Sequence, residues 1–148
     1  MIRRAQAGDA DALTALMHAS SAYRGNYARI LQGYAVTPDQ IARDHVYLAT
    51  DANGALAGFY SLTLQPEPEL DLMFVADAAQ GTGLGRALFA HFRALAASLG
   101  VQSVLIVSHP PALGFYQRQG AVRTATKPPT DSAPWERPIL RLEVQSAG

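Results

Sequence analysis

The chain has 148 residues, of which 49% are hydrophobic, and its 12 basic and 12 acidic residues leave no formal net charge. This length predicts a single domain over residues 1–148 with one substantial core, and the high apolar and low charged content excludes a disordered chain. The neutral balance argues against nucleic acid as a partner, because nucleic-acid binders normally carry a basic face.

The residue types that are missing also limit the chemistry. Because there is no cysteine, disulfides, a thiol nucleophile and a zinc site built on thiolates are excluded, and no metal site is expected. No apolar run follows Arg3 and Arg4, and no stretch has the length and composition of a membrane span. We therefore expect a cytoplasmic protein without a membrane partner.

Three short helices are expected in the first third of the chain. The first opens at Asp9, whose carboxylate suits the positive end of a helix dipole, and it buries Leu13 and Met17. A second, over Ala28–Gln32, follows a loop that carries two tyrosines. The third begins at Thr37, an N-cap residue followed by proline at the first helical position.

Apolar runs predict a sheet of six to seven strands. They lie at Ile2–Arg4, Val46–Thr50, Leu56–Leu64, Leu70–Val75, Val101–Val107, Val122–Thr126 and Pro138–Val144. One face of the third strand should carry Leu56, Tyr60, Leu62 and Leu64. The second to fourth strands should form an antiparallel meander, and the next strand should be a parallel neighbour reached by a helical crossover. The expected fold is α/β (α+β), a mixed, mostly antiparallel twisted sheet with helices on both faces.

The stretch from Leu70 to Leu99 consists of a strand, a glycine turn and a helix, and the rest of the chain can be placed around it. The helix carries one apolar stripe, made of Leu84, Leu88, Phe92, Leu95 and Leu99. A turn with three glycines at the start of a helix leaves several backbone N–H groups free, next to the positive end of the helix dipole. The sequence therefore predicts a phosphate or pyrophosphate held by the backbone of residues 81–86.

Two common phosphate motifs do not fit this turn. A dinucleotide fingerprint would need glycine where the chain has Arg86, and the Gly-Lys-Ser/Thr end of a P-loop is absent. The turn does match the pattern Q/R-x-x-G-x-G/A at Gln80, Gly83 and Gly85, five residues after a strand that ends at Val75. In this it resembles the pyrophosphate-binding signature of the GNAT superfamily of N-acetyltransferases.

A second segment strengthens the resemblance. Residues 109–120, HPPALGFYQRQG, are similar to the family pattern (D/N)-P-x-A-x-x-F-Y-x-x-x-G that follows the fifth strand. The resemblance spans nearly the whole chain and is most specific from Glu69 to Ala121. It implies a GNAT fold and an N-acetyltransferase that takes its acetyl group from acetyl-CoA.

By the same resemblance, the glycine turn grips the pyrophosphate of coenzyme A. The preceding strand splays from its neighbour at a bulge, so that its backbone pairs with the pantetheine arm and the acetyl carbonyl. The implied cofactor-binding residues are Met73, Phe74, Val75, Gln80, Gly81, Thr82, Gly83, Leu84, Gly85, Arg86 and His109. His109 replaces the family's usual Asp or Asn, and it either contacts the cofactor arm or caps the last helix.

Acetyl transfer to an amine needs a neutral amine, a donor for the oxyanion and a proton for the leaving thiolate. Without cysteine, direct attack in a ternary complex is the simplest route. Tyr116 occupies the family's tyrosine position and is the candidate general acid, whereas Phe115 is expected to pack. Glu69, which shares a strand face with Asp71, is the candidate base, although both carboxylates could simply be solvated. A glutamate that some relatives carry on the fifth strand is Val104 here.

The sequence says less about the acceptor than about the acetyl donor. Tyr23 and Tyr27 lie in a segment where the family shapes its acceptor pocket, and with Asp71 they are the candidate substrate-binding residues, although loop aromatics also serve as packing plugs. The expected partner is a small-molecule or peptide amine, and a homodimer is left open. Two alternatives remain: a catalytically idle acyl-CoA-binding or sensory module on the same fold, and a nucleotide-binding protein that uses the same turn.

Overall fold

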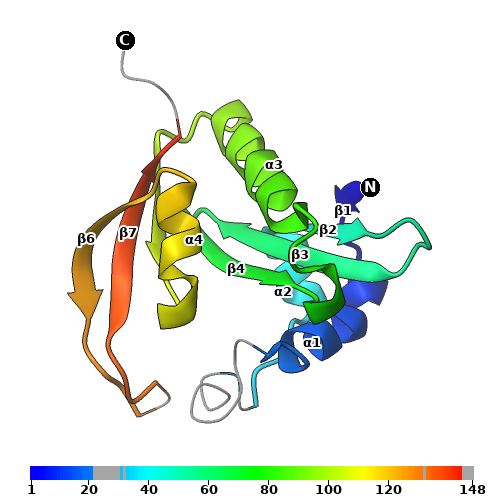
Figure 1. Ribbon diagram of the computed structural model, residues 1–148. Helices are drawn as coiled ribbons and strands as arrows, with labels where there is room; N and C mark the ends of the chain where they lie inside the picture. Colours follow the sequence, from blue (N-terminus) through cyan, green and yellow to red (C-terminus); the bar gives the residue numbers. More distant parts are fainter. Residues whose placement is uncertain (22–30, 32, 132, 145–148) are drawn as a thin grey trace.

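The computed structural model describes residues 1–21, 31, 33–131 and 133–144. Seven strands form one sheet in the order β1-β2-β3-β4-β5-β7-β6 (Figure 1). The strands are β1 (Ile2–Arg4), β2 (His45–Thr50), β3 (Leu56–Thr63), β4 (Glu69–Val75), β5 (Ser103–Val107), β6 (Val122–Lys127) and β7 (Arg137–Glu143). The helices are α1 (Ala10–His18), α2 (Pro38–Arg43), α3 (Leu84–Ser98) and α4 (Leu113–Arg118), and 3-10 turns occur at η1 (Ala7–Asp9), η4 (Asp77–Ala79) and η5 (Pro110–Ala112).

The strand directions confirm the expected mixed sheet. Strands β2 to β4 form an antiparallel meander with β1 paired antiparallel to β2, β4 and β5 are parallel, and β5, β7 and β6 are again antiparallel. Helix α3 supplies the long connection that a parallel pair requires. The helix expected over Ala28–Gln32 lies, except for Leu31, outside the described residues.

Each face of the sheet has its own hydrophobic core. Helices α3 and α4 cover the core that contains Tyr60, Phe92 and Leu140, and α1 and α2 cover the core that contains Leu13 and Phe59 (Figure 1). Neighbours on β3, Phe59 and Tyr60, belong to different cores, as the two-residue period of a strand requires. The expectation of helices on both faces is therefore confirmed.

The buried stripe of α3 differs from the predicted one. Leu88 and Phe92 are buried as expected, but Phe89 and Ala96 are buried as well, whereas Leu99 is 41% exposed. The stripe is wider than a single helix face because α3 packs on α4 as well as on the sheet, and Phe89 makes ring contacts with that helix. Leu99 lies beyond the last helical turn, at the C-cap.

The prediction that Leu56 shares a strand face with Tyr60 and Leu62 is also wrong. The pairing of β2 with β3 shifts register between Ala49 and Thr50, which leaves Ala57 as an extra residue on β3. Leu56 therefore packs against the core under α1 and α2, whereas Tyr60 and Leu62 pack under α3. A register shift of one residue moves a side chain to the other face of a sheet, and no residue pattern announces it.

Candidate active site

The site begins where β4 and β5 diverge. They pair in register only at Glu69 and Leu105, supported by a 2.9 Å hydrogen bond from the Leu105 amide to the Pro68 carbonyl. On its other side β4 stays paired with β3 as far as Val75. A pocket of about 900 Å³ is lined by residues of both diverging strands, which is a usual size for a small-molecule site.

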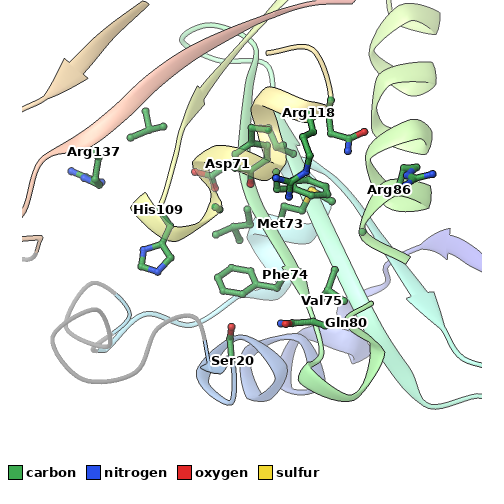
Figure 2. Close-up of a pocket in the computed structure, with 18 of the residues that line it drawn as sticks. Ser20, Asp71, Met73, Phe74, Val75, Gln80, Arg86, His109, Arg118 and Arg137 are labelled. Carbon is green, nitrogen blue, oxygen red and sulfur yellow. The ribbon is translucent and has the colours of Figure 1, made fainter. Parts of the chain in front are cut away.

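The expected bulge in β4 lies at Asp71. Ser61 of β3 is paired with Leu72, and Leu62 with Leu70, so Asp71 has no partner position on β3. The residues that follow, from Leu72 to Val75, return to regular pairing. A bulge bends its strand and redirects the side chains around it, and Asp71 lines the pocket (Figure 2).

Strand β5 shows the other side of this divergence. Although its residues form a nearly continuous apolar run, only Val104 and Ile106 are fully buried within it. Leu105 and Val107 are half-buried and line the pocket. The apolar wall that they form can accept an uncharged chain laid between the two strands.

The glycine turn has the backbone that an anion site requires. Gly81 and Gly83 have φ values of 79° and 86°, in the left-handed region that glycine adopts without strain, and Gly83 is the N-cap of α3. Within the described part of the chain, the main-chain amides of residues 81–86 donate no hydrogen bond to the protein. Six amides at the positive end of a helix are thus available to an anionic ligand.

Most of the predicted cofactor residues meet in the pocket. Those that line it are Met73, Phe74, Val75, Gln80, Gly81, Gly83, Gly85, Arg86 and His109. Thr82 and Leu84 belong to the same turn but are not among the lining residues. Side chains from β4, from the turn before α3 and from the segment before α4 therefore face one cavity (Figure 2).

Gly85 differs from the other two glycines of the turn, because a side chain there would meet only ordinary packing contacts. Its φ is not positive, but a Cβ there would lie 3.4 Å from the Phe115 ring and 3.7 Å from a Val75 methyl group. Helix α4 therefore packs closely against the start of α3 through Phe115, which confirms a packing role for that ring. The same ring also lines the pocket.

Tyr116, the candidate acid, sits at the border between core and pocket. It is buried, belongs to the core under α3 and α4, and contacts the rings of Phe89 and Phe115 at centroid distances of 6.2 and 5.4 Å. It also lines the pocket. The fifth-strand position, Val104, is completely buried in the same core and cannot supply a carboxylate.

The two candidate carboxylates both line the pocket, and both have raised pKa values. Partial desolvation is the main cause of the raised pKa of Glu69, the charge of Asp71 adds to it, and Lys127 opposes it. Desolvation by the pocket walls also raises the pKa of Asp71, with Asp44 adding to the effect and Arg43 opposing it. A raised pKa brings a carboxylate closer to the range in which a general base works at neutral pH.

His109 is buried and lines the pocket. It stands at the N-cap position of η5, but its side chain makes no capping hydrogen bond to that turn. The capping alternative for this residue is therefore wrong, since the contact between Ala112 and residue 109 uses the backbone carbonyl instead. The other alternative, contact with the cofactor arm, stays a prediction.

The pocket includes residues that sequence reasoning missed. Tyr34, Arg118, Lys127 and Arg137 all line it. Tyr34 accepts a 3.0 Å hydrogen bond from the side-chain amide of Gln40, and burial, with the charge of Asp71 adding to it, raises the pKa of Tyr34. No local pattern marks these residues, because they come from segments far apart in the chain. The predicted Tyr23 and Tyr27 lie outside the described residues.

Two further structural findings bear on the class of protein. Among the described residues, no group of three or more histidine, aspartate or glutamate side chains is arranged to hold a metal ion. In the same part of the chain, every helix is too short or too polar to cross a membrane.

Solved structures with similar folds were compared with the chain. A GCN5-related N-acetyltransferase from Rhodopseudomonas palustris aligns with a TM-score of 0.83 at 18% identity, over 97% of this chain and 94% of the other. The ribosomal-protein-S18-alanine N-acetyltransferase from Escherichia coli gives 0.75 at 21%, over 100% and 96%. A GNAT family acetyltransferase from Elizabethkingia anophelis with acetyl-CoA bound gives 0.61 at 19%, over 71% and 79%.

A search of curated proteins finds no match. The family model of the acetyltransferase (GNAT) domain, however, matches residues 14–132, which is most of the chain. The matched segment contains the diverging strands, the glycine turn with its free amides, and helix α4, which carries Phe115 and Tyr116. The chain is therefore a member of the GNAT acetyltransferase family.

Proposed function

We propose that this chain transfers an acetyl group from acetyl-CoA to a primary amine by direct attack in a ternary complex. The observation that carries the proposal is the row of unbonded amides at residues 81–86, beside a gap between β4 and β5. The amides suit a diphosphate, and the gap suits the extended, amide-bearing arm that connects it to the thioester. A structural neighbour that holds acetyl-CoA supports this assignment.

Residues of this chain align the donor, stabilise the negative charge on the carbonyl oxygen and protonate the leaving sulfur. Bound acetyl-CoA supplies the thioester whose carbonyl carbon accepts the amine nitrogen, and coenzyme A departs with the sulfur. The backbone of β4 between the bulge at Asp71 and Val75 aligns the arm, and an N–H next to the bulge stabilises the negative charge on the carbonyl oxygen. Tyr116 donates its hydroxyl proton to the departing sulfur.

The two carboxylates of the pocket bind and deprotonate the incoming amine. Asp71 holds the incoming ammonium group, and Glu69 accepts its proton through water, so that the nitrogen has a free electron pair when it attacks. The raised pKa of Glu69 supports this role. Two protons leave the nitrogen in all: the ammonium proton passes through Glu69 to solvent, and the proton lost when the amide forms restores the hydroxyl of Tyr116, so that the reaction releases one proton overall.

Binding and turnover should be measured separately. Calorimetry with acetyl-CoA, and with ATP as the competing ligand, tests the anion site; we expect binding of acetyl-CoA alone. Release of the coenzyme A thiol over a panel of primary amines then tests transfer. Preference for ATP would contradict the donor assignment. Acetyl-CoA binding without transfer to any amine would instead favour an idle binding module.

A further inference from the structure

The charged residues of the pocket divide into two groups at opposite ends. Arg86 and Arg118 come from α3 and α4, which meet at the glycine turn where Phe115 packs on Gly85. The second group contains Glu69, Asp71, Lys127 and Arg137. Figure 2 shows Arg137 and Arg86 on opposite sides of the cavity, with Asp71 between them.

The geometry of the sheet accounts for this separation. Glu69 and Val75 are the two ends of β4, and at the usual rise per residue they are about 20 Å apart. The glycine turn follows the Val75 end. The Glu69 end is next to Lys127, whose charge lowers the pKa of Glu69. Lys127 is in turn the cross-strand partner of Arg137.

The guanidinium of Arg137 is positioned to bind an anion. Its Nε is buried without a hydrogen-bond partner, and its side chain forms no ion pair or hydrogen bond within the described residues. A buried guanidinium donor that stays unpaired is unfavourable, and the fork of an arginine matches a carboxylate with two parallel hydrogen bonds. By contrast, Arg141 on the same strand is paired with Glu67 at 3.0 Å.

We infer that the acceptor is a free amino acid, whose ammonium group lies against Asp71 and Glu69 and whose carboxylate is bound by Arg137 with Lys127. This inference rests on the proposed function, because it identifies the substrate of that same site. Two carboxylates and two cations make up this group of pocket-lining residues. A zwitterion leaves that charge balance intact, whereas a simple amine adds an uncompensated positive charge and a phosphate monoester an excess of negative charge.

The cation pair gives the pocket a way to discriminate against near relatives of an amino acid. An amide or an ester of the same compound keeps the amine but loses the carboxylate, so Arg137 would stay unpaired in the complex. A site that is built to bind a charged group rejects the analogue that lacks it, because its own buried donors are then left without partners. Arg137 is therefore a specificity-determining residue in this inference.

The test measures coenzyme A release with the amino acids, each matched with its carboxamide, and with alkylamines, aminoalkyl phosphates and short peptides. We expect the best acceptor to be a free amino acid whose kcat/KM exceeds that of its amide by about tenfold or more. In Arg137→Gln this ratio should fall to near one, through a higher KM for the amino acid, while acetyl-CoA binding and the melting temperature stay unchanged.

Arg123→Gln is the matched control, since Arg123 lies on the neighbouring strand, bonded to Thr126 and outside the pocket. It should keep the preference of the wild-type chain. Acetylation of amines with no preference for the carboxylate, or an unchanged ratio in Arg137→Gln, would overturn the inference and leave the proposed function standing. Failure to bind acetyl-CoA at all would overturn the proposed function itself.

Amino-acid binding without turnover gives a second readout. In the presence of coenzyme A, calorimetric titration of the best amino acid should give binding to the wild-type chain and to Arg123→Gln, and none at the same concentrations to Arg137→Gln. Equal binding to all three proteins would contradict the role of Arg137 even if their activities differed.

Discussion

The two ends of the pocket differ in the groups that would bind a ligand. At the proposed donor end, the anion site consists of main-chain amides, and the side chains of Gln80 and Thr82 donate hydrogen bonds back to η4. At the acceptor end, four charged side chains from β4, β6 and β7 form the walls. Amides hold a ligand part that stays constant, whereas side chains can change from protein to protein without disturbing the backbone. The proposed donor site therefore depends on the backbone of the fold, and the proposed acceptor site on the side chains of the individual chain.

The largest expected effect lies between the two ends. Tyr116→Phe keeps the ring that packs on Phe89 and Phe115 but removes the proton donor. We expect kcat to fall by about a hundredfold or more, with acetyl-CoA affinity unchanged, because general acids contribute on this scale. Steady-state thiol release and calorimetry measure the two quantities. Wild-type turnover in this variant would exclude Tyr116 as the acid.

Removing the base should act at the acceptor end alone. Glu69→Gln should lower kcat/KM for the amine by about tenfold to a hundredfold and leave acetyl-CoA binding intact. Only the deprotonated carboxylate accepts a proton, so wild-type activity should fall as the pH drops through the pKa of Glu69, which is raised above the ordinary 4.5.

A pH profile of kcat/KM checks this assignment. The acid limb should be present in the wild-type chain and absent in Glu69→Gln. Glu67→Gln is the control, because Glu67 pairs with Arg141 and does not line the pocket. The same acid limb in all three proteins would assign the titrating group elsewhere.

The affinity for acetyl-CoA should depend on the backbone conformation of the glycine turn. Gly83→Ala places a side chain at a φ of 86°, which destabilises the fold by about 1 kcal/mol and distorts the amides. We expect acetyl-CoA affinity to fall about tenfold. Gly100→Ala has the same kind of strain, at a φ of 76°, beyond the far end of α3. It should show a similar loss in thermal stability with normal affinity; equal affinities in both variants would contradict the backbone site.

The smallest effect is expected for a side chain at the same end. Gln80→Ala should change acetyl-CoA affinity by about threefold at most, since the Gln80 side chain is exposed and its amide already donates to Asp77. Calorimetry beside Gly83→Ala makes the comparison direct. A larger loss in Gln80→Ala than in Gly83→Ala would show that side chains, not amides, dominate the donor end.

The glycine turn of the proposed donor site and the order of the elements can be predicted from the amino-acid sequence alone. The glycines at 81, 83 and 85, the strand that ends at Val75 and the Phe-Tyr helix are encoded in short segments, so their spacing is readable without a structure. The left-handed conformation of Gly81 and Gly83 is a local property of glycine. The apolar alternation predicted the strands for the same reason, because it follows the backbone period.

The surroundings of the two carboxylates at the proposed acceptor end depend on the tertiary structure. The bulge at Asp71 and the single register pair between Glu69 and Leu105 depend on how three strands align, and neither has a residue signature. Lys127 and Arg137 line the same pocket as the two carboxylates because β7 inserts between β5 and β6 in the sheet. Contacts between distant segments are set by packing of the whole chain, so the neighbours that define the acceptor could not be read from local patterns.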